Sequence, residues 1–218
     1  MTIPSTNSFG MLRAMVGIGA LCGLLIVLTY EGTLPRVERL KAEALQRAIF
    51  NVVPNVAETK AFSWEDEKFV LAGGDNTAVI YAGYDKAGSF RGVAIEASGQ
   101  GYADIIRILY GYDPEKQLVV GFYVLESKET PGLGDKIEKD EVFLSNFISL
   151  DVKLNDDLQS IANQVVPVKR GDKDSPWEVD GITGATISSR AIANIINQSI
   201  QVWAPRIYQN MESFEDVP

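Results

Sequence analysis

The hydrophobic pattern of the chain begins with an uninterrupted apolar run. Residues 14–30 carry no charge and lie between Arg13 and Glu31. As a helix rising about 1.5 Å per residue, this run is roughly 25 Å long, and residues 9–12 could lengthen it toward the ~30 Å of a bilayer core. The pattern predicts one transmembrane helix over residues 14–30, preceded by a short N-terminal tail over residues 1–13.

A cleaved signal peptide shares this pattern of a charged residue followed by an apolar run. Residues 31–35 lack the small-x-small site that cleavage prefers, and Leu21 directly before Cys22 is unlike a lipoprotein site. We therefore expect an uncleaved anchor. Gly19 and Gly23 have the spacing that lets a neighbouring helix approach closely, although Gly is also frequent in membrane helices.

Beyond the anchor, the apolar positions recur at helical and then at strand spacing. Residues 34–53 predict an amphipathic helix closed by Pro54, so we place a linker helix at 31–56 and one globular domain at 57–218. Alternating and β-branched runs predict strands over residues 69–72, 77–84, 90–97, 105–112, 117–125 and 165–168.

Short turns between these strands predict an antiparallel sheet. Gly73 to Asn76 would join the first two strands as a hairpin, and Asp113 to Lys116 would join the strands at 105–112 and 117–125. Residues 98–102 interrupt the strand that begins at Phe90.

Two helices are predicted in the second half of the chain. The first covers residues 135–150, with Ile137, Val142, Phe143 and Phe147 inward. The second follows residue 186 and carries an apolar face of Ile192, Ile195, Ile196, Val202 and Trp203. Residues 203–218 have mixed polarity and are expected to trail along the surface. The fold class is therefore α+β, one domain with an antiparallel sheet flanked by helices.

Composition removes several kinds of chemistry. A net charge of −9 argues against nucleic acid as a partner. The single Cys22 excludes an intrachain disulfide, and a chain with no His cannot hold a Ser-His-Asp triad or a His-ligated metal. We expect no metal site and no catalytic side chain, which favours a protein whose reactivity comes from a bound cofactor.

The most informative stretch is Asp180-Gly-Ile-Thr-Gly-Ala-Thr-Ile-Ser-Ser-Arg190, directly before the last apolar helix. A turn that enters a helix presents free backbone N–H groups and the positive end of the helix dipole, which favour phosphate. Thr186, Ser188 and Ser189 would then be hydroxyls beside a phosphate site. Alternatively, Thr183 or Thr186 is only an N-cap, and the spacing leaves both interpretations open.

This stretch resembles the (S/T)-G-A-T signature of the FMN-binding domain family, found in the C and G subunits of the Nqr and Rnf membrane electron-transfer complexes. Glu129 to Gly134 reads E-T-P-G-L-G and resembles a second motif of that family. Two motifs in the expected order are more specific than either alone. The resemblance implies that a flavin transferase uses FAD to attach FMN to Thr186 through a phosphodiester.

The resemblance also implies where the flavin lies. Residues 98–102 contain a G-x-G-Y sequence resembling a family loop near the flavin, although a simple loop between strands explains it equally well. Thr130 could donate a hydrogen bond to the flavin edge, whereas Glu129 is not expected to face the ring, because its charge would oppose that of the reduced flavin. The predicted cofactor-binding residues are Thr186, Thr183, Gly184, Ala185, Ser188, Ser189, Glu129, Thr130, Pro131, Gly132, Leu133, Gly134, Gly101 and Tyr102.

The function implied is that of an electron-transfer component of a translocase, not of a free-standing enzyme. We favour the Rnf G subunit, whose complex oxidises ferredoxin, reduces NAD and transports ions. The alternatives are the C subunit of a sodium-translocating NADH:quinone reductase and a non-redox, membrane-tethered binding or assembly module. A separate reductase would need a nucleotide-binding G-x-G-x-x-G after a strand, and the sequence has none.

Orientation in the membrane receives two opposite predictions. Arg13 precedes the apolar run and four basic residues follow it closely, at positions 36, 39, 41 and 47. The positive-inside rule would place the C-terminal domain in the cytoplasm. The family resemblance implies a single-pass protein of the inner membrane with its domain on the outer, periplasmic face, beside other membrane subunits of the complex. We follow the resemblance.

Overall fold

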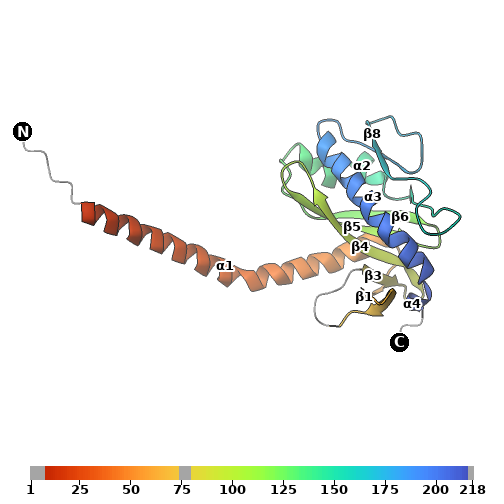
Figure 1. Cartoon of the computed structure of the whole chain (residues 1–218), viewed down its shortest axis with the longest axis horizontal. Helices are drawn as coiled ribbons and strands as arrows, with labels where there is room; N and C mark the ends of the chain where they lie inside the picture. The colour runs from red at the N-terminus through yellow and green to blue at the C-terminus, as the bar shows by residue number, and fades with distance from the viewer. Residues whose placement is uncertain (1–7, 74–79, 216–218) are drawn as a thin grey trace, which may run out of the picture. The chain divides into compact units, whose positions relative to one another are not determined.

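The computed structural model describes residues 8–73 and 80–215 (Figure 1). The chain divides into two units, Met1–Ala44 and Leu45–Pro218. The helices are α1 (Ser8–Val52), the 3-10 helix η1 (Gly134–Glu138), α2 (Glu141–Ser145), α3 (Thr186–Gln209) and α4 (Glu212–Glu215). The strands are β1 (Glu58–Glu65), β2 (Lys68–Leu71), β3 (Ile80–Tyr84), β4 (Phe90–Gln100), β5 (Ile105–Asp113), β6 (Leu118–Glu126), β7 (Leu150–Asp151), β8 (Val166–Val168) and β9 (Glu178–Asp180).

Helix α1 contains both the predicted transmembrane run and most of the predicted linker. It is one helix of 45 residues with Pro35 in its interior. Proline has no backbone N–H and its ring crowds the preceding turn, so the helix lacks one hydrogen bond at this point. The helix ends at Val52, just before Pro54, as its sequence predicts.

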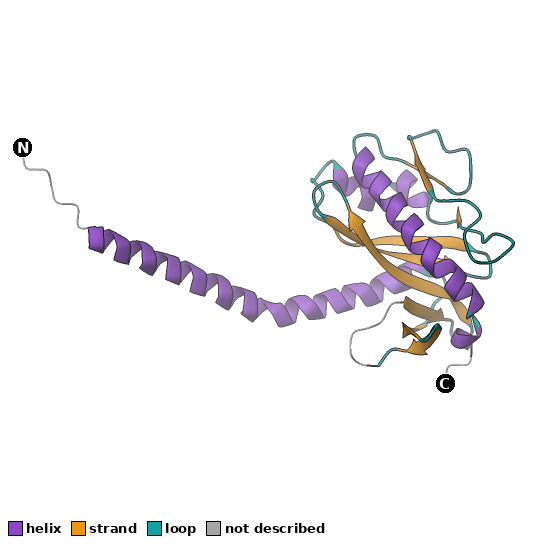
Figure 2. Ribbon diagram, in the orientation of Figure 1, coloured by secondary structure: helices purple, strands orange, loops and turns teal. Residues whose placement is uncertain are grey.

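The domain is built on a seven-stranded antiparallel sheet with the order β2-β1-β3-β4-β5-β6-β7 (Figure 2). Four of the predicted strands lie within a few residues of β2, β5, β6 and β8. Strands β8 and β9 form a separate parallel pair. The α+β class with an antiparallel sheet and flanking helices is confirmed.

The first predicted hairpin is wrong, because a strand absent from the prediction separates its two members. Strand β1 lies between β2 and β3 and pairs with both. The β1–β2 turn is made by Asp66 and Glu67, whose φ values of 47° and 61° suit a tight two-residue turn. The turn expected at 73–76 and the start of the strand expected at 77–84 lie partly outside the described residues.

Opposite faces of the central strands bury two different helices. Ala94 and Leu109 face the end of α1, where they pack with Ala48, Ile49 and Val52. The alternate residues of β4 and β5 join the main core beneath α3, together with Ile192 and Ile196. This alternation follows from the two-residue period of a strand, because neighbouring side chains point to opposite faces.

Two glycines allow the end of α1 to approach the sheet. A Cβ on Gly111 or Gly121 would overlap the backbone carbonyl oxygen of Val52, and its distance to the Val52 carbonyl carbon would be 2.7 Å in both cases. The helix backbone therefore lies directly on the strand backbone. Leu45 to Val52, the last two turns of α1, belong structurally to the domain.

Three further predictions need correction. Strand β4 does not stop at Ala97 but continues through Gln100. The helix expected over 135–150 is two short helices, because Asp140 caps a new one by accepting the Phe143 N–H at 3.0 Å. Ile137, Phe143 and Phe147 are buried as predicted, but Val142 is half exposed.

The C-terminal segment also differs from its prediction. Helix α3 continues to Gln209, with Val202 exposed and Trp203 partly buried, and α4 follows it. Phe214 of α4 is completely buried and stacks on Phe90. The segment is part of the core through Ala204 and Ile207 of α3 as well as Phe214 of α4, and the isolated Phe214 has no apolar periodicity that would predict its burial.

Candidate functional site

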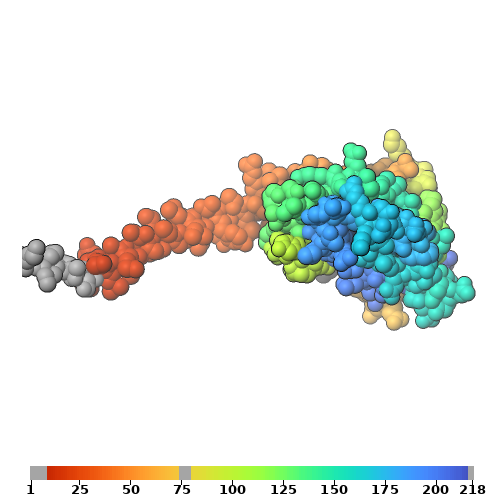
Figure 3. All heavy atoms as spheres, turned by 90° about the horizontal axis from the view of Figure 1, so that it is seen from above, coloured from red at the N-terminus to blue at the C-terminus, as the bar shows by residue number. Residues whose placement is uncertain are grey.

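Three segments that are distant in sequence meet at one end of the sheet and enclose a groove. They are the β4–β5 connection, residues 129–134 after β6, and the turn that enters α3; Figure 3 shows their yellow-green, green and blue atoms side by side. The groove has a volume of about 330 Å³, within the range of small-molecule sites. It is lined by Tyr102, Glu129, Thr130, Leu133, Gly134, Gly184, Ala185, Thr186, Ile187 and Ser188.

The groove brings together most of the residues predicted to bind the cofactor. Ile187 is the lining residue that the prediction missed, and it follows the (S/T)-G-A-T signature directly. Thr183, Pro131 and Gly132 are predicted residues that are exposed but do not line the groove. Gly101 and Ser189 are buried behind its walls.

Thr186 is the first residue of α3, and its side chain is exposed. The N-cap is Ala185, and no side chain caps the helix by a hydrogen bond. The interpretation of Thr183 or Thr186 as an N-cap is therefore wrong. Gly184, with a φ of +84°, turns the chain into the helix and leaves the Thr186 hydroxyl beside the groove.

The start of α3 presents backbone donors toward this hydroxyl. The first intrahelical bond at this end is donated by Ser189 N–H to the Ala185 carbonyl at 2.9 Å. In the described part of the chain, the N–H groups of Thr186, Ile187 and Ser188 have no protein acceptor. A helix of 24 residues also places the positive end of its dipole here. The turn is therefore suited to a phosphate group.

Ser189 stabilises the turn from inside the domain. Its hydroxyl is buried, accepts the Ile182 N–H at 3.3 Å and donates to the Thr186 carbonyl oxygen at 3.2 Å. The predicted role of Ser189 as a hydroxyl beside the cofactor is not the role that these contacts give it. Ser189 shapes the peptide that carries Thr186.

Glu129 and Ser188 join the walls of the groove. The Glu129 carboxylate is 6% exposed and accepts hydrogen bonds from the Tyr102 N–H and the Ala103 N–H, each at 2.9 Å. Its other oxygen accepts the hydroxyl of Ser188. Ala103 is absent from the predicted residues, because a backbone donor leaves no signal in the side-chain pattern.

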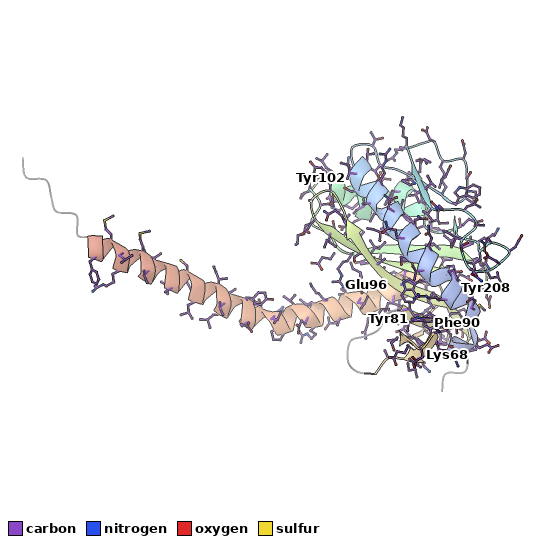
Figure 4. The ribbon with its side chains drawn as sticks, in the orientation of Figure 1. Lys68, Tyr81, Phe90, Glu96, Tyr102 and Tyr208 are labelled. Carbon is purple, nitrogen blue, oxygen red and sulfur yellow. The ribbon has the colours of Figure 1, made fainter. Side chains whose placement is uncertain are left out.

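The rim of the groove combines apolar and polar side chains. Tyr102 is 66% exposed, at the tip of the β4–β5 hairpin labelled in Figure 4, and Leu133 is 52% exposed. Thr130 begins a turn in which its carbonyl oxygen accepts the Leu133 N–H at 3.1 Å. The Thr130 side chain is exposed at the groove, so it remains a candidate hydrogen-bond donor to a ligand.

Lys136 is a further residue at the groove that the sequence motifs do not predict. A Cβ added to Gly184 would lie 3.9 Å from its Nζ, so the ammonium group is next to the turn that carries Thr186. Within residues 8–73 and 80–215, the Lys136 ammonium forms no hydrogen bond or ion pair. It is half-buried and lies in η1, directly after the loop at 129–134.

Exposed ion pairs fix the loops on either side. Lys139 donates to Asp135 at 2.7 Å, and this bond lowers the pKa of the Asp135 carboxyl. Lys128 donates to Asp104 at 2.6 Å and lowers the pKa of that carboxyl in the same way. Both carboxylates are therefore ionised and hydrogen-bonded to other lysines, whereas Lys136, whose charge also lowers the pKa of Asp135, has its ammonium beside Gly184.

The groups around the groove are those that bind an organic anion. They are hydroxyls, backbone N–H groups, one ammonium and apolar side chains, and the one lining carboxylate, that of Glu129, accepts hydrogen bonds from the protein itself. In the part of the chain that the structure describes, no three His, Cys, Asp or Glu residues are grouped to hold a metal ion.

Helix α1 is long and apolar enough to cross a membrane. A window of it reaches a mean hydropathy of 2.3, and none of that window is buried in the protein. A solvent-exposed helix of this composition would be unfavourable in water, because its large aliphatic side chains have no partners. The finding supports a membrane-anchored protein.

Comparison with known families places the groove within a recognised domain. The FMN-binding domain family matches residues 101–201, which include all three segments of the groove. The G subunit of the ion-translocating oxidoreductase complex of Haemophilus influenzae is 30% identical over 205 residues, covering 91% of this chain and 90% of that protein. The G subunit of the Na(+)-translocating ferredoxin:NAD(+) oxidoreductase complex of Acetobacterium woodii is 28% identical over 208 residues, with coverages of 93% and 91%.

A solved structure shares the fold. The crystal structure of the C subunit of Na(+)-translocating NADH-quinone reductase from Parabacteroides distasonis aligns with a TM-score of 0.58, covering 84% of this chain and 98% of that one. At 18% identity this likeness concerns the fold alone. Sequence similarity along nearly the whole chain is what identifies the family. The chain belongs to the family of G subunits of ion-translocating oxidoreductase complexes, and its groove lies in an FMN-binding domain.

Proposed function

We propose that this chain is the membrane-anchored flavoprotein subunit of an Rnf-type complex and relays electrons through FMN esterified to Thr186. The observation that carries the proposal is the state of the Thr186 hydroxyl. It is exposed at the groove and opens the longest helix of the domain, yet it does not cap that helix. Such a hydroxyl is available for a covalent bond.

The residues of the groove fit FMN. Its phosphate would meet the backbone N–H groups at the start of α3 and the ammonium of Lys136, both of which favour an anion. Tyr102, Leu133 and Ile187 would provide apolar surface for the isoalloxazine ring, and Thr130 a hydrogen bond to its edge. The matched FMN-binding domain supports the identity of the cofactor.

Attachment would be a phosphoryl-group transfer from FAD catalysed by a flavin transferase. The Thr186 Oγ forms a bond to the phosphorus of the FMN half, the pyrophosphate P–O bond of FAD breaks, and AMP leaves. The hydroxyl proton goes to a base on the transferase or to solvent. This chain contributes the nucleophilic oxygen on a preformed turn, because the described groove contains no His, Cys or Lys general base in contact with Thr186.

Once bound, FMN supplies reversible electron transfer, and the protein supplies retention and position. A phosphodiester prevents the cofactor from dissociating in either redox state. The related proteins named above are subunits of ion-translocating complexes, one of them a ferredoxin:NAD(+) oxidoreductase. By this similarity, we place the chain beside other membrane subunits of such a complex, as one electron-transfer step.

The same similarity favours the G subunit over the two alternatives. The likeness to the C subunit of a quinone reductase concerns the fold. The uncapped, exposed Thr186 argues against a binding module in which the turn only starts a helix. We place α1 in the inner membrane as a single span, with the domain on the outer, periplasmic face.

The test is covalent flavin on a denaturing gel. The full chain is co-expressed with a flavin transferase, and the band is examined under ultraviolet light. Thr183→Val is a matched control, because Thr183 is an exposed threonine three residues before the proposed attachment point. We expect fluorescence in the wild type and in Thr183→Val, and none in Thr186→Val. A dark wild-type band beside an active transferase would reject the proposal.

A further inference from the structure

The Glu129 carboxylate is buried, and the three hydrogen bonds that it accepts all come from the walls of the groove. It is 6% exposed, and a buried carboxylate is costly unless it is hydrogen-bonded. One oxygen accepts two backbone N–H groups from the β4–β5 connection, and the other accepts the Ser188 hydroxyl from the first turn of α3. Three segments of the groove therefore meet at one side chain.

Two glycines of the predicted binding motifs make room for this carboxylate. A Cβ on Gly101 would lie 2.5 Å from Glu129 Oε1. A Cβ on Gly134 would lie 2.8 Å from the Glu129 Cβ and 3.0 Å from Ser188 Oγ, and would overlap Glu129 Oε2. Neither position tolerates a side chain. Gly134 is explained by the space that Glu129 and Ser188 need, and Gly101 by the space that Glu129 and Ile106 need, without reference to a ligand.

We propose that Glu129 is the positioning residue of the flavin site. Its carboxylate sets the distance between the β4–β5 connection, the 129–134 loop and the start of α3. Its bond to Ser188, two residues after Thr186, fixes the first turn of α3. Its bond to the Tyr102 N–H fixes the backbone that carries the aromatic side chain at the tip of the hairpin (Figure 4). The inference rests on the proposed function, because it concerns the same groove.

This role differs from contact with the flavin. Each carboxylate oxygen already accepts a protein donor, two backbone N–H groups at Oε1 and the Ser188 hydroxyl at Oε2, so the contacts of Glu129 are with the groove's own walls. The two backbone donors belong to peptide groups that a substitution at position 129 leaves in place, so removing their acceptor leaves both partly buried N–H groups without their protein partner. A shape change of the groove follows, because its loops then have to reach other acceptors.

Two substitutions at position 129 separate positioning from general packing. Glu129→Gln keeps an oxygen for the Tyr102 and Ala103 N–H groups and directs its amide at Ser188 Oγ, which can accept as well as donate. Glu129→Ala removes every acceptor. Asp113→Ala is the matched control: this carboxylate is 8% exposed, accepts the Lys116 N–H at 3.0 Å, and lies at the opposite end of β5 from the groove.

The first measurement needs no flavin. In the full-length Thr186→Val protein, hydrogen exchange is followed on the peptide that contains Tyr102 and Ala103. We expect Glu129→Ala to speed exchange there by about tenfold and Glu129→Gln by less than about threefold, in line with the loss or retention of the acceptor. Unchanged exchange in Glu129→Ala would overturn the structural part of the inference.

The second measurement is the rate at which flavin transferase loads FMN onto Thr186, together with the visible spectrum of the loaded protein. We expect Glu129→Ala to slow loading about tenfold and to shift the flavin bands, Glu129→Gln to restore both, and Asp113→Ala to change neither. Ser188→Ala removes only one of the three hydrogen bonds of Glu129 and should slow loading by a smaller factor. This variant replaces Glu129→Ala in the test if Glu129→Ala does not fold.

The outcomes distinguish this inference from the proposed function. Loading and spectrum identical to wild type in Glu129→Ala and in Ser188→Ala would overturn the positioning role while FMN attachment stands. If Glu129→Ala and Asp113→Ala slowed FMN loading equally, the cause would be a general loss of stability, and this result would also overturn the positioning role. A wild-type protein that takes no FMN would reject the proposed function, whereas the exchange measurement would still report on Glu129.

Discussion

The side chains around the (S/T)-G-A-T turn divide into those that hold it and those that it leaves available. Ser188 and Ser189 are buried and bonded within the protein, whereas the hydroxyls of Thr183 and Thr186 face outward. Ser and Thr look alike in a motif, but burial gives them opposite roles. Both threonines are exposed, but only Thr186 lines the groove.

Lys136 provides the charge that the motif itself lacks. We predict that Lys136→Gln slows FMN loading about three- to tenfold at low salt, which corresponds to ~0.7–1.4 kcal/mol of interaction between one ammonium and a phosphate near a protein surface. The measurement is the initial loading rate at two salt concentrations, since screening should reduce the difference between wild type and variant.

Lys139→Gln is the matched control for that experiment. Lys139 is three residues further on, exposed, and already paired with Asp135. Its removal should leave the loading rate within about twofold of wild type, because its charge is compensated in the native protein. Equal loading rates in the wild type and in Lys136→Gln at low salt would contradict the assigned contact.

At the scale of elements, the close contact between the end of α1 and the sheet depends on Gly111 and Gly121. We predict that Gly111→Ala lowers the free energy of unfolding by about 2–3 kcal/mol or more, because the new methyl group overlaps the Val52 carbonyl and forces helix and strand apart. Gly73→Ala is the control, because a Cβ there meets no atom of the described residues within 4 Å. The measurement is denaturant unfolding followed by circular dichroism. Equal free energies of unfolding for Gly111→Ala and Gly73→Ala would contradict this prediction.

Sequence alone predicts the elements whose pattern is local. The strands at 105–112 and 117–125 are predicted because a Pro-containing turn joins two apolar runs, and α3 because its apolar positions recur every three or four residues. Strand β1 is missed, since its turn uses Asp66 and Glu67 in place of the Gly or Asn that usually marks positive φ.

The sequence predicts most of the residues that line the groove, but not the contacts that hold them together. The two motifs identify most of the lining residues by family resemblance. Lys136, Ile187 and the backbone N–H of Ala103 have no pattern of their own, because their roles depend on which loops the sheet brings together. The predicted surface tail fails for a similar reason: Phe214 is buried by partners far away in sequence, such as Phe62 and Phe90.

At the scale of the molecule, the domain begins earlier than the boundary of 57 that the sequence suggests. Ala48, Ile49, Val52 and Val53 are buried in the second unit. We predict that a fragment of residues 45–218 folds cooperatively without the membrane helix. In a fragment of residues 57–218, the free energy of unfolding should be lower by about 5 kcal/mol or more, because the buried side chains of Ile49, Val52 and Val53 are missing. That loss is comparable to the whole stability of many domains.

Thermal unfolding of the two purified fragments checks this boundary. The fragment 45–218 should show one sharp transition, and the fragment 57–218 a much lower or absent one. Fragments with the same melting temperature would show that the end of α1 contributes little to the domain. Gly111→Ala in the longer fragment provides an internal comparison, because it disturbs the same contact from the strand side.

Alkaline pH should destabilise the domain through its buried tyrosines. Burial raises the pKa of Tyr84 from 10.0 to about 12, with a smaller contribution from Glu58, and burial also raises the pKa of Tyr110 and Tyr112. The folded state prefers the neutral phenol. The stability that the neutral Tyr84 contributes is therefore fully present below pH ~10 and is lost as pH rises through about 12. Tyr84 also donates to the Phe214 carbonyl at 2.9 Å.

The variant Tyr84→Phe tests that assignment. We expect the free energy of unfolding of the wild type to fall between pH 10 and 12. The variant should be less stable at neutral pH, because it lacks the hydrogen bond to Phe214, but its stability should fall less steeply with alkali. Denaturant unfolding at a series of pH values gives both slopes, and parallel curves would contradict the assignment.

The central claim is tested most directly by mass spectrometry of the protein isolated from its own cells. Trypsin releases residues 174–190, between Lys173 and Arg190, as one peptide that contains both Thr183 and Thr186. The account predicts this peptide with the added mass of FMN less one water, and fragment ions that locate the addition at Thr186. An unmodified peptide, or an addition located at Thr183, would contradict it.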